Sequence, residues 1–255
     1  MRFGYLTLSR VSSRETPVLD LQLTNIPLRI LPLGASITYG VHSSDGNGYR
    51  RPLRDQLRSD GWEVNMVGSQ SHGNMRDYDV EARPGNIIDQ VRSASSASLP
   101  CEPNIVLINA GTNDCRLGID INHAGARMRS LIENLLSAED MADTLIVLST
   151  LLPSGNAAIS RNTPAVNAQY RELVQTMRAE GTRIVLAKMS GLLYPQDFTQ
   201  DGQVDDTHPG DTGYATMARI WYEAIKDAAR QGLIAPRDSL GGGLSCDKRS
   251  GDGVV

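Results

Sequence analysis

Five short apolar runs, separated by polar and turn-forming residues, follow one another along the middle of the chain. They span residues 28–33, 63–68, 104–110, 144–150 and 182–187. These runs are nearly continuous in Ile, Val and Leu, which is typical of strands buried on both faces of a parallel sheet. We therefore expect five parallel strands.

Between these runs, apolar residues recur at the spacing of a helix with one buried face. The segments that show this spacing are 49–59, 87–96, 124–136, 163–180 and 212–231. Strands and helices in alternation predict right-handed crossovers and a doubly wound sheet. The expected fold class is α/β: a single three-layer α/β/α domain with a five-stranded, mainly parallel, flavodoxin-like sheet.

The two ends of the chain lack such periodicity. Residues 1–26 are interpreted as a flexible leader, residues 27–235 as the folded domain, and the Gly-rich stretch 236–255 as a disordered tail. The first residues contain no apolar stretch of about 7–15 residues, so no signal peptide is expected. The sequence does not assign a cellular compartment.

Charge and hydropathy exclude several classes of partner. The 255 residues include 25 Lys and Arg against 29 Asp and Glu, a net charge of −4 with no basic cluster. This pattern does not suit a nucleic-acid binder. No run approaches the ~18 apolar residues of a membrane span, so we expect no membrane partner. We also expect a monomer. The basic side chains of the 49–59 helix, Arg50 among them, are expected on its exposed face.

Cysteine and histidine spacing predicts neither a metal site nor a cofactor. Cys101, Cys115 and Cys246 are too few for a disulfide scaffold, no pair has CxxC spacing, and unpaired thiols are expected. His42, His72 and His123 are far apart and lack i, i+4 spacing. The acidic run that includes Asp201 and Asp206 lacks a calcium-loop pattern, so these two carboxylates are expected to be solvated.

Candidate chemistry lies in the loops that follow the strands, where doubly wound sheets bind ligands. After the first strand, GASITYG places Ser36 where its hydroxyl and backbone N–H face the end of the sheet. After the third, GTND places Asn113, whose amide can donate hydrogen bonds to developing negative charge. Taken singly, Ser36 could be an ordinary turn or N-cap serine, and Asn113 could close an Asx turn.

A third candidate precedes the last helix. In DDTHP, Asp205 and His208 are three residues apart, close enough for the carboxylate to orient one imidazole nitrogen while the other faces outward. Pro209, Gly210 and a helix start follow directly. We therefore expect the chain to be held in place here.

Taken together, the segments resemble the SGNH, or GDSL-type, hydrolases over residues 28–229. Four blocks appear in the order of that family: GASITYG at 34–40, the glycine of EARPGNIIDQ, GTND at 111–114 and DDTHP at 205–209. The resemblance implies that Ser36 is the nucleophile, His208 its general base and Asp205 the carboxylate that orients His208. It also implies an oxyanion hole made of the backbone N–H groups of Ser36 and Gly85 and the amide of Asn113.

A narrower resemblance is to family-3 carbohydrate esterases and fungal acetyl xylan esterases. RILPLGASITYG, PNIVLINAGTND and DDTHPGDTGYATMA carry it. It implies a short-acyl ester of a carbohydrate or small molecule as substrate, cleaved without a cofactor. Lysophospholipase or thioesterase activity and a non-catalytic carbohydrate-binding role remain as alternatives. Ala35 replaces the aspartate of the usual Gly-Asp-Ser, which leaves the named roles intact and can alter loop rigidity or substrate contacts.

Overall fold

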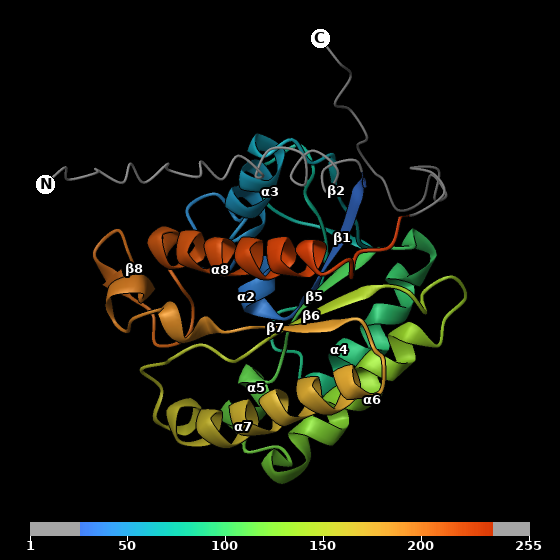
Figure 1. Cartoon of the computed structure of the whole chain (residues 1–255). Coiled ribbons are helices and arrows are strands. Elements are labelled where there is room, and N and C mark those ends of the chain that lie inside the picture. Colours follow the sequence, from blue (N-terminus) through green and yellow to red (C-terminus); the bar gives the residue numbers. More distant parts are fainter. Residues whose placement is uncertain (1–25, 237–255) are drawn as a thin grey trace, which may run out of the picture.

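A mainly parallel sheet forms the centre of the computed structural model, which describes residues 26–236 (Figure 1). Its strands run in the order β3-β4-β1-β5-β6-β7, and β2 also pairs with β1. The strands are β1 (Leu28–Gly34), β2 (Val64–Met66), β3 (Gln70–Ser71), β4 (Asp79–Ala82), β5 (Ile105–Asn109), β6 (Leu145–Ser149) and β7 (Ile184–Ala187), with a separate hairpin of β8 (Thr199–Gln200) and β9 (Gln203–Val204).

Helices of very different length connect these strands. The α-helices are α2 (Ser36–Tyr39), α3 (Arg50–Ser59), α4 (Ile88–Ser95), α5 (Thr112–Leu117), α6 (Ala124–Leu136), α7 (Ala157–Ala179) and α8 (Asp211–Arg230). The 3₁₀ helices are η1 (Ser96–Cys101), η2 (Ile121–His123), η3 (Met189–Gly191) and η4 (Gln196–Phe198). None of the helices between residues 26 and 236 combines the length and the apolar character that crossing a lipid bilayer requires.

All five predicted strands are present and pair in parallel, which confirms the α/β prediction. The first half of β1 pairs with β2, and its last two residues pair with β4. β2 and β4 therefore follow one another along the edge of β1 that is opposite β5. The sheet gains one antiparallel pair, β3 with β4.

Alternate residues of each parallel strand enter two separate hydrophobic cores. Leu28 and Ile30 of β1 point to one face, whereas Leu31 and Leu33 point to the other. Because strand side chains alternate with a period of two, a strand buried on both faces must be apolar at every position. This requirement explains the continuous apolar runs.

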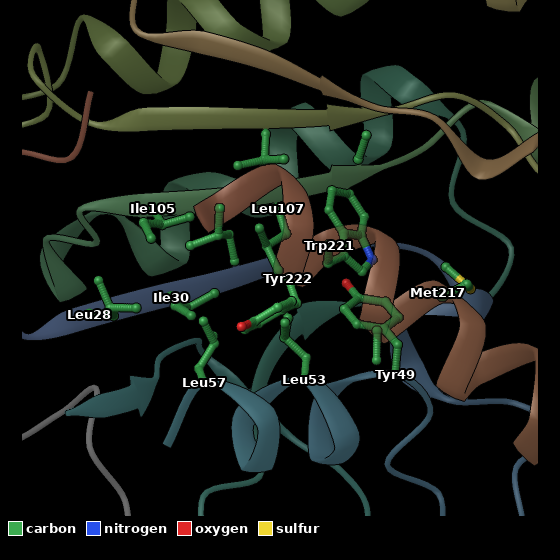
Figure 2. Packing of buried hydrophobic residues seen from close by; sticks show 14 of the residues in the cluster. Leu28, Ile30, Tyr49, Leu53, Leu57, Ile105, Leu107, Met217, Trp221 and Tyr222 are labelled. Atoms are coloured by element: carbon green, nitrogen blue, oxygen red, sulfur yellow. The ribbon is translucent and has the colours of Figure 1, made fainter. Parts of the chain in front are cut away.

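Helices α3 and α8 cover one face of the sheet, and α4, α6 and α7 cover the other (Figure 1). In the first core, Leu53 and Leu57 of α3 and Trp221 of α8 pack onto β1 and β5, all without solvent exposure (Figure 2). Trp221 lies against Tyr49, with 5.7 Å between ring centroids. The two cores fix the strand ends from which the candidate loops emerge.

Some elements differ from the sequence prediction. Helix α7 begins at Ala157 rather than at residue 163, because Asn156 Oδ1 caps it by accepting the N–H groups of Ala158 and Ile159. Strand β4 was not predicted, because Asp79 and Glu81 interrupt its apolar pattern. Both side chains are buried and hydrogen-bonded to serines, which explains how a strand with two carboxylates stays in the sheet.

The prediction of an exposed Arg50 is wrong, because this side chain is fully buried. Its guanidinium donates hydrogen bonds to four backbone carbonyls, those of Tyr78 at 3.1 Å, Tyr39 at 3.2 Å, Gly46 at 3.0 Å and His72 at 2.9 Å. Arginine presents five N–H donors in a fixed geometry. Arg50 therefore joins the end of α2 and the loop that follows it to the segment between β3 and β4.

The prediction of unpaired thiols holds for Cys115, which is buried and free. It is wrong for Cys101, which is disulfide-bonded. The spacing argument considered only whether Cys101 could reach Cys115. The expected leader and tail also lie outside the described residues, apart from residues 26 and 236 at their inner edges.

Candidate active site

Short helices begin directly after β1 and β5 and place Ser36 and Asn113 at the same end of the sheet. Glycine permits both turns. An added Cβ on Gly34 would lie 2.4 Å from Asn109 O. Gly111 has φ +115°, and an added Cβ there would lie 2.7 Å from Tyr170 Oη. Because adjacent parallel strands end at one edge, the two turns bring the hydroxyl and the amide into one region.

Ser36, His208 and Asp205 form a continuous chain of contacts across 172 residues of sequence. Ser36 Oγ lies 2.9 Å from His208 Nε2. His208 Nδ1 lies 3.1 Å from each carboxylate oxygen of Asp205. For a neutral imidazole, this places the proton on Nδ1, which donates to Asp205, and leaves Nε2 to accept from the serine hydroxyl.

The loop before α8 is shaped by the Asp205 carboxylate itself. Its Oδ1 accepts the backbone N–H groups of Thr207 at 2.7 Å and His208 at 2.8 Å. Burial raises the pKa of the Asp205 carboxyl, but these hydrogen bonds and the imidazole outweigh burial, and the pKa falls below its usual value of 3.8. Asp205 is therefore ionised at neutral pH and fixes the orientation of His208.

The loop that carries Gly85 is bonded to Asn113 of α5. Asn113 Nδ2 donates a hydrogen bond of 2.9 Å to Asn86 O, and an amide NH₂ group has a second donor available. Asn86 N donates to Arg83 O across a tight turn in which Gly85 has φ +89°. Positive φ, rather than crowding, requires glycine here, because an added Cβ would have no neighbour within 4 Å.

A small cavity opens beside the serine. Its volume is about 200 Å³, and it is lined by Ala35, Ser36, Ile37, Asn109, Ala110, Gly111, Thr112 and Asn113. Two of the three residues proposed for oxyanion binding, Ser36 and Asn113, thus border one space, whereas Gly85 is not part of its lining.

Sequence reasoning missed Asp206 and Arg116. The Asp206 side chain is 47% exposed, as expected of a solvated carboxylate, but it also accepts hydrogen bonds from Arg116 Nη2 at 3.2 Å and Asn156 Nδ2 at 3.1 Å. The backbone carbonyl of Asp206 also accepts the N–H of Gly155 at 2.9 Å. The only signal in the sequence was the position of Asp206 between Asp205 and His208.

The other histidines do not gather around a common point. His72 stacks on Tyr39 with 3.6 Å between ring centroids, and His123 Nδ1 lies 2.6 Å from an oxygen of Asp120. Among residues 26–236, no group of three or more His, Cys, Asp or Glu side chains is arranged to hold a metal ion.

Comparisons with known proteins find relatives that match most of the chain. Residues 33–216 match the model of the family described as GDSL-like Lipase/Acylhydrolase. A multidomain esterase from Ruminococcus flavefaciens is 26% identical over 227 residues, which cover 78% of this chain and 28% of that protein. The chain therefore spans little more than a quarter of that relative.

Solved structures show the same fold. A family 3 carbohydrate esterase from Clostridium thermocellum is 25% identical, with a TM-score of 0.69 over 81% of this chain and 99% of that one. A family 3 carbohydrate esterase from Talaromyces cellulolyticus is 18% identical, with a TM-score of 0.66 over 80% of this chain and 99% of that one. At 18% identity the second likeness concerns the fold alone.

Proposed function

The chain belongs to the GDSL-like lipase/acylhydrolase family, and we propose that it is a carboxylic ester hydrolase in which Ser36, His208 and Asp205 form the catalytic triad. We further propose that it removes short acyl groups, acetyl above all, from a carbohydrate or another small molecule. The oxyanion hole would consist of the backbone N–H groups of Ser36 and Gly85 and the side-chain amide of Asn113.

The observation that carries this proposal is the 2.9 Å contact between Ser36 Oγ and His208 Nε2, with Asp205 on the far side of the imidazole. A serine hydroxyl is a weak nucleophile unless a base removes its proton as it attacks. A candidate base must lie within about 2.6–3.2 Å of the oxygen that carries the proton. His208 meets this requirement in the absence of substrate.

In the proposed first half-reaction, Ser36 Oγ attacks the carbonyl carbon of the ester while its proton moves to His208 Nε2. The carbonyl oxygen becomes an oxyanion, which the three proposed donors stabilise by hydrogen bonds. The bond to the alcohol oxygen then breaks, and His208 returns the proton to that oxygen. The alcohol leaves, and the acyl group remains on Ser36.

Water completes the cycle. His208 Nε2 takes a proton from a water molecule, whose oxygen attacks the acyl-serine carbonyl and forms a second oxyanion. The bond to Ser36 Oγ breaks, the proton returns to Ser36, and the carboxylic acid is released. Throughout, Asp205 keeps the imidazole oriented and stabilises the positive charge that it carries transiently.

Two observations support the proposed substrate, one for its acyl group and one for its alcohol component. Among the residues that line the cavity beside Ser36, the apolar ones are Ala35, Ile37 and Ala110, which offer little apolar surface to a long acyl chain. Longer chains need more apolar surface to gain binding energy, at roughly 0.8 kcal/mol for each buried CH₂. The family 3 carbohydrate esterase from Clostridium thermocellum among the similar structures favours a carbohydrate as the alcohol component.

The test compares the purified wild-type chain, Ser36→Ala and Ser130→Ala on aryl acetate, octanoate and palmitate. Ser130 is a matched control, since its hydroxyl only bonds Ala126 O within α6. Hydrolysis should fall with chain length, disappear in Ser36→Ala and persist in Ser130→Ala. Wild-type turnover by Ser36→Ala would overturn the triad. Preference for long chains would favour a lysophospholipase or thioesterase, and no hydrolysis of any ester a non-catalytic carbohydrate-binding role.

A further inference from the structure

The loop that carries Asp205 and His208 is bonded to the helix that carries Asn113. Three residues outside the proposed triad and oxyanion hole make this connection: Asp206 and Thr207, on the loop, and Arg116, on α5. Arg116 Nη2 lies 3.2 Å from Asp206 Oδ1 and also donates a hydrogen bond to Thr207 Oγ1. These bonds link positions 90 and 91 residues apart in sequence.

Asp206 fixes the loop on a second side as well. Its Oδ2 accepts a hydrogen bond of 3.1 Å from Asn156 Nδ2, at the start of α7. Its backbone carbonyl accepts hydrogen bonds from Ser154 Oγ at 2.5 Å and Gly155 N at 2.9 Å. The bonds from Thr207, Asn156 and Arg116 lower the pKa of the Asp206 carboxyl and outweigh burial, so the group is ionised at neutral pH.

Arg116 is well placed to affect Asn113. Both belong to α5, which spans only Thr112–Leu117. They are three residues apart, so they are neighbours on the helix surface. A helix this short has few internal hydrogen bonds, so a displacement of Arg116 also shifts Asn113, which lies about one turn away.

The connection is too exposed to contribute much to stability. The Arg116 and Asp206 side chains are 38% and 47% exposed, and ion pairs this exposed contribute little to the free energy of folding. Catalysis depends on position far more steeply, because a displacement of about 1 Å can cost roughly a hundredfold in rate. The contacts of Asp206 therefore matter more for alignment than for folding.

On the basis of the proposed function, we infer that Asp206 and Arg116 are positioning residues. Their ion pair holds the base, His208, in register with the oxyanion donor, Asn113. The pair touches neither the substrate nor the reacting atoms. Its loss would leave substrate affinity largely unchanged and would slow the chemical step.

The test measures kcat, KM and Tm for Asp206→Ala, Arg116→Met and the double variant on an aryl acetate. We expect kcat to fall about tenfold in each single variant, within the range that small displacements produce, with KM within about twofold. Tm should fall by less than about 4 °C, since a surface pair contributes little. The double variant should lose no more than the worse single variant, because the two residues act as one unit.

Two further variants separate alignment from a general effect of charge or folding. Arg116→Lys retains a cation that can reach one acceptor, and it should recover most of the kcat lost in Arg116→Met. Arg129→Met breaks a comparable exposed pair with Glu180, where Arg129 Nη2 lies 2.6 Å from Glu180 Oε2, and it should leave kcat unchanged. The remaining contacts of the Asp206 carbonyl do not depend on its side chain, so Asp206→Ala should fold.

The inference fails if Asp206→Ala and Arg116→Met keep kcat within about twofold of wild type, well short of an alignment effect. It also fails if Arg129→Met loses as much kcat as Arg116→Met. Ser36→Ala, measured in the same series, keeps the two proposals distinguishable. An inactive Ser36→Ala together with normal Asp206→Ala leaves the triad intact and removes only the positioning role, whereas an active Ser36→Ala removes the triad.

Discussion

Replacing Asn113 by alanine removes one proposed oxyanion donor and one structural hydrogen bond at the same time. Asn113 borders the cavity beside Ser36, and its Nδ2 donates to Asn86 O at 2.9 Å. The first role predicts a loss of rate, and the second predicts a loss of stability. A second asparagine in the chain allows the two effects to be separated.

The magnitudes follow from the number of hydrogen bonds lost. Removal of one oxyanion donor typically lowers kcat by about 10²–10³, or roughly 2.7–4 kcal/mol of transition-state stabilisation. Loss of the neutral hydrogen bond to Asn86 O lowers the free energy of unfolding by about 0.5–1.5 kcal/mol. For a chain of this size, about 1 kcal/mol corresponds to roughly 2–4 °C in Tm. We therefore expect Asn113→Ala to melt a few degrees below wild type and to lose about 10²–10³ in kcat.

Asn162→Ala is the matched control. Asn162 Nδ2 also donates to a backbone carbonyl of α5, Cys115 O, at 2.8 Å, but Asn162 does not border the cavity. Both variants should lose similar Tm in a thermal melt, whereas steady-state kinetics on an aryl acetate should show a large loss of kcat only in Asn113→Ala. Equal kcat values for the two variants would refute the assignment of Asn113 as an oxyanion donor.

Three further outcomes are expected. Gly85→Ala and Gly202→Ala both place a Cβ on a residue with positive φ in open space, which should lower the free energy of unfolding by about 1–2 kcal/mol in each variant. Tm should therefore fall similarly in both variants, whereas kcat should fall only in Gly85→Ala. Equal kcat values would contradict a role for the Gly85 turn. The pKa of the Asp205 carboxyl is lower in the folded chain than its usual value of 3.8. The carboxylate therefore stabilises the fold fully above pH 3.8 and loses this effect as the pH falls through the lower pKa of the folded state. Denaturant titrations should therefore show the stability gap between wild type and Asp205→Asn shrinking from about pH 5 to about pH 2, and a constant gap would be inconsistent with that shift. Burial raises the pKa of the Cys115 thiol to about 11, so mass spectrometry should find its alkylation at pH 8 more than about a hundredfold slower in the native than in the unfolded chain; equal rates would show that the thiol is accessible.

The sequence predicted the central sheet well because burial on both faces leaves a strong local signal. Each position of β1 or β5 must be apolar, whichever face it meets. Strand β4 escaped prediction for the complementary reason: Glu81 is buried, and its charge is balanced by Arg83 and by serine hydroxyls. Arg83 is only two residues away, but the two serines lie 12 and 17 residues from Glu81, and no local pattern records those contacts.

The candidate site divides in the same way. Ser36, Asp205 and His208 stood out because each follows a strand or precedes a helix with suitable neighbours. Gly85 was identified only through the family resemblance, since a glycine in a turn has many explanations. The contact of Arg116 with Asp206 could not be predicted, because it joins two exposed, ordinary-looking side chains that only the folded chain brings together.

The most direct test of the proposed triad is covalent labelling with an aryl phosphonate, which reacts with serines that an adjacent base activates. We predict that mass spectrometry will find one phosphonyl group, on Ser36, and that His208→Ala will remain unlabelled under the same conditions while keeping the wild-type fold by circular dichroism. A label on another residue, or labelling of Ser36 at the wild-type rate in His208→Ala, would contradict the proposal that His208 activates Ser36.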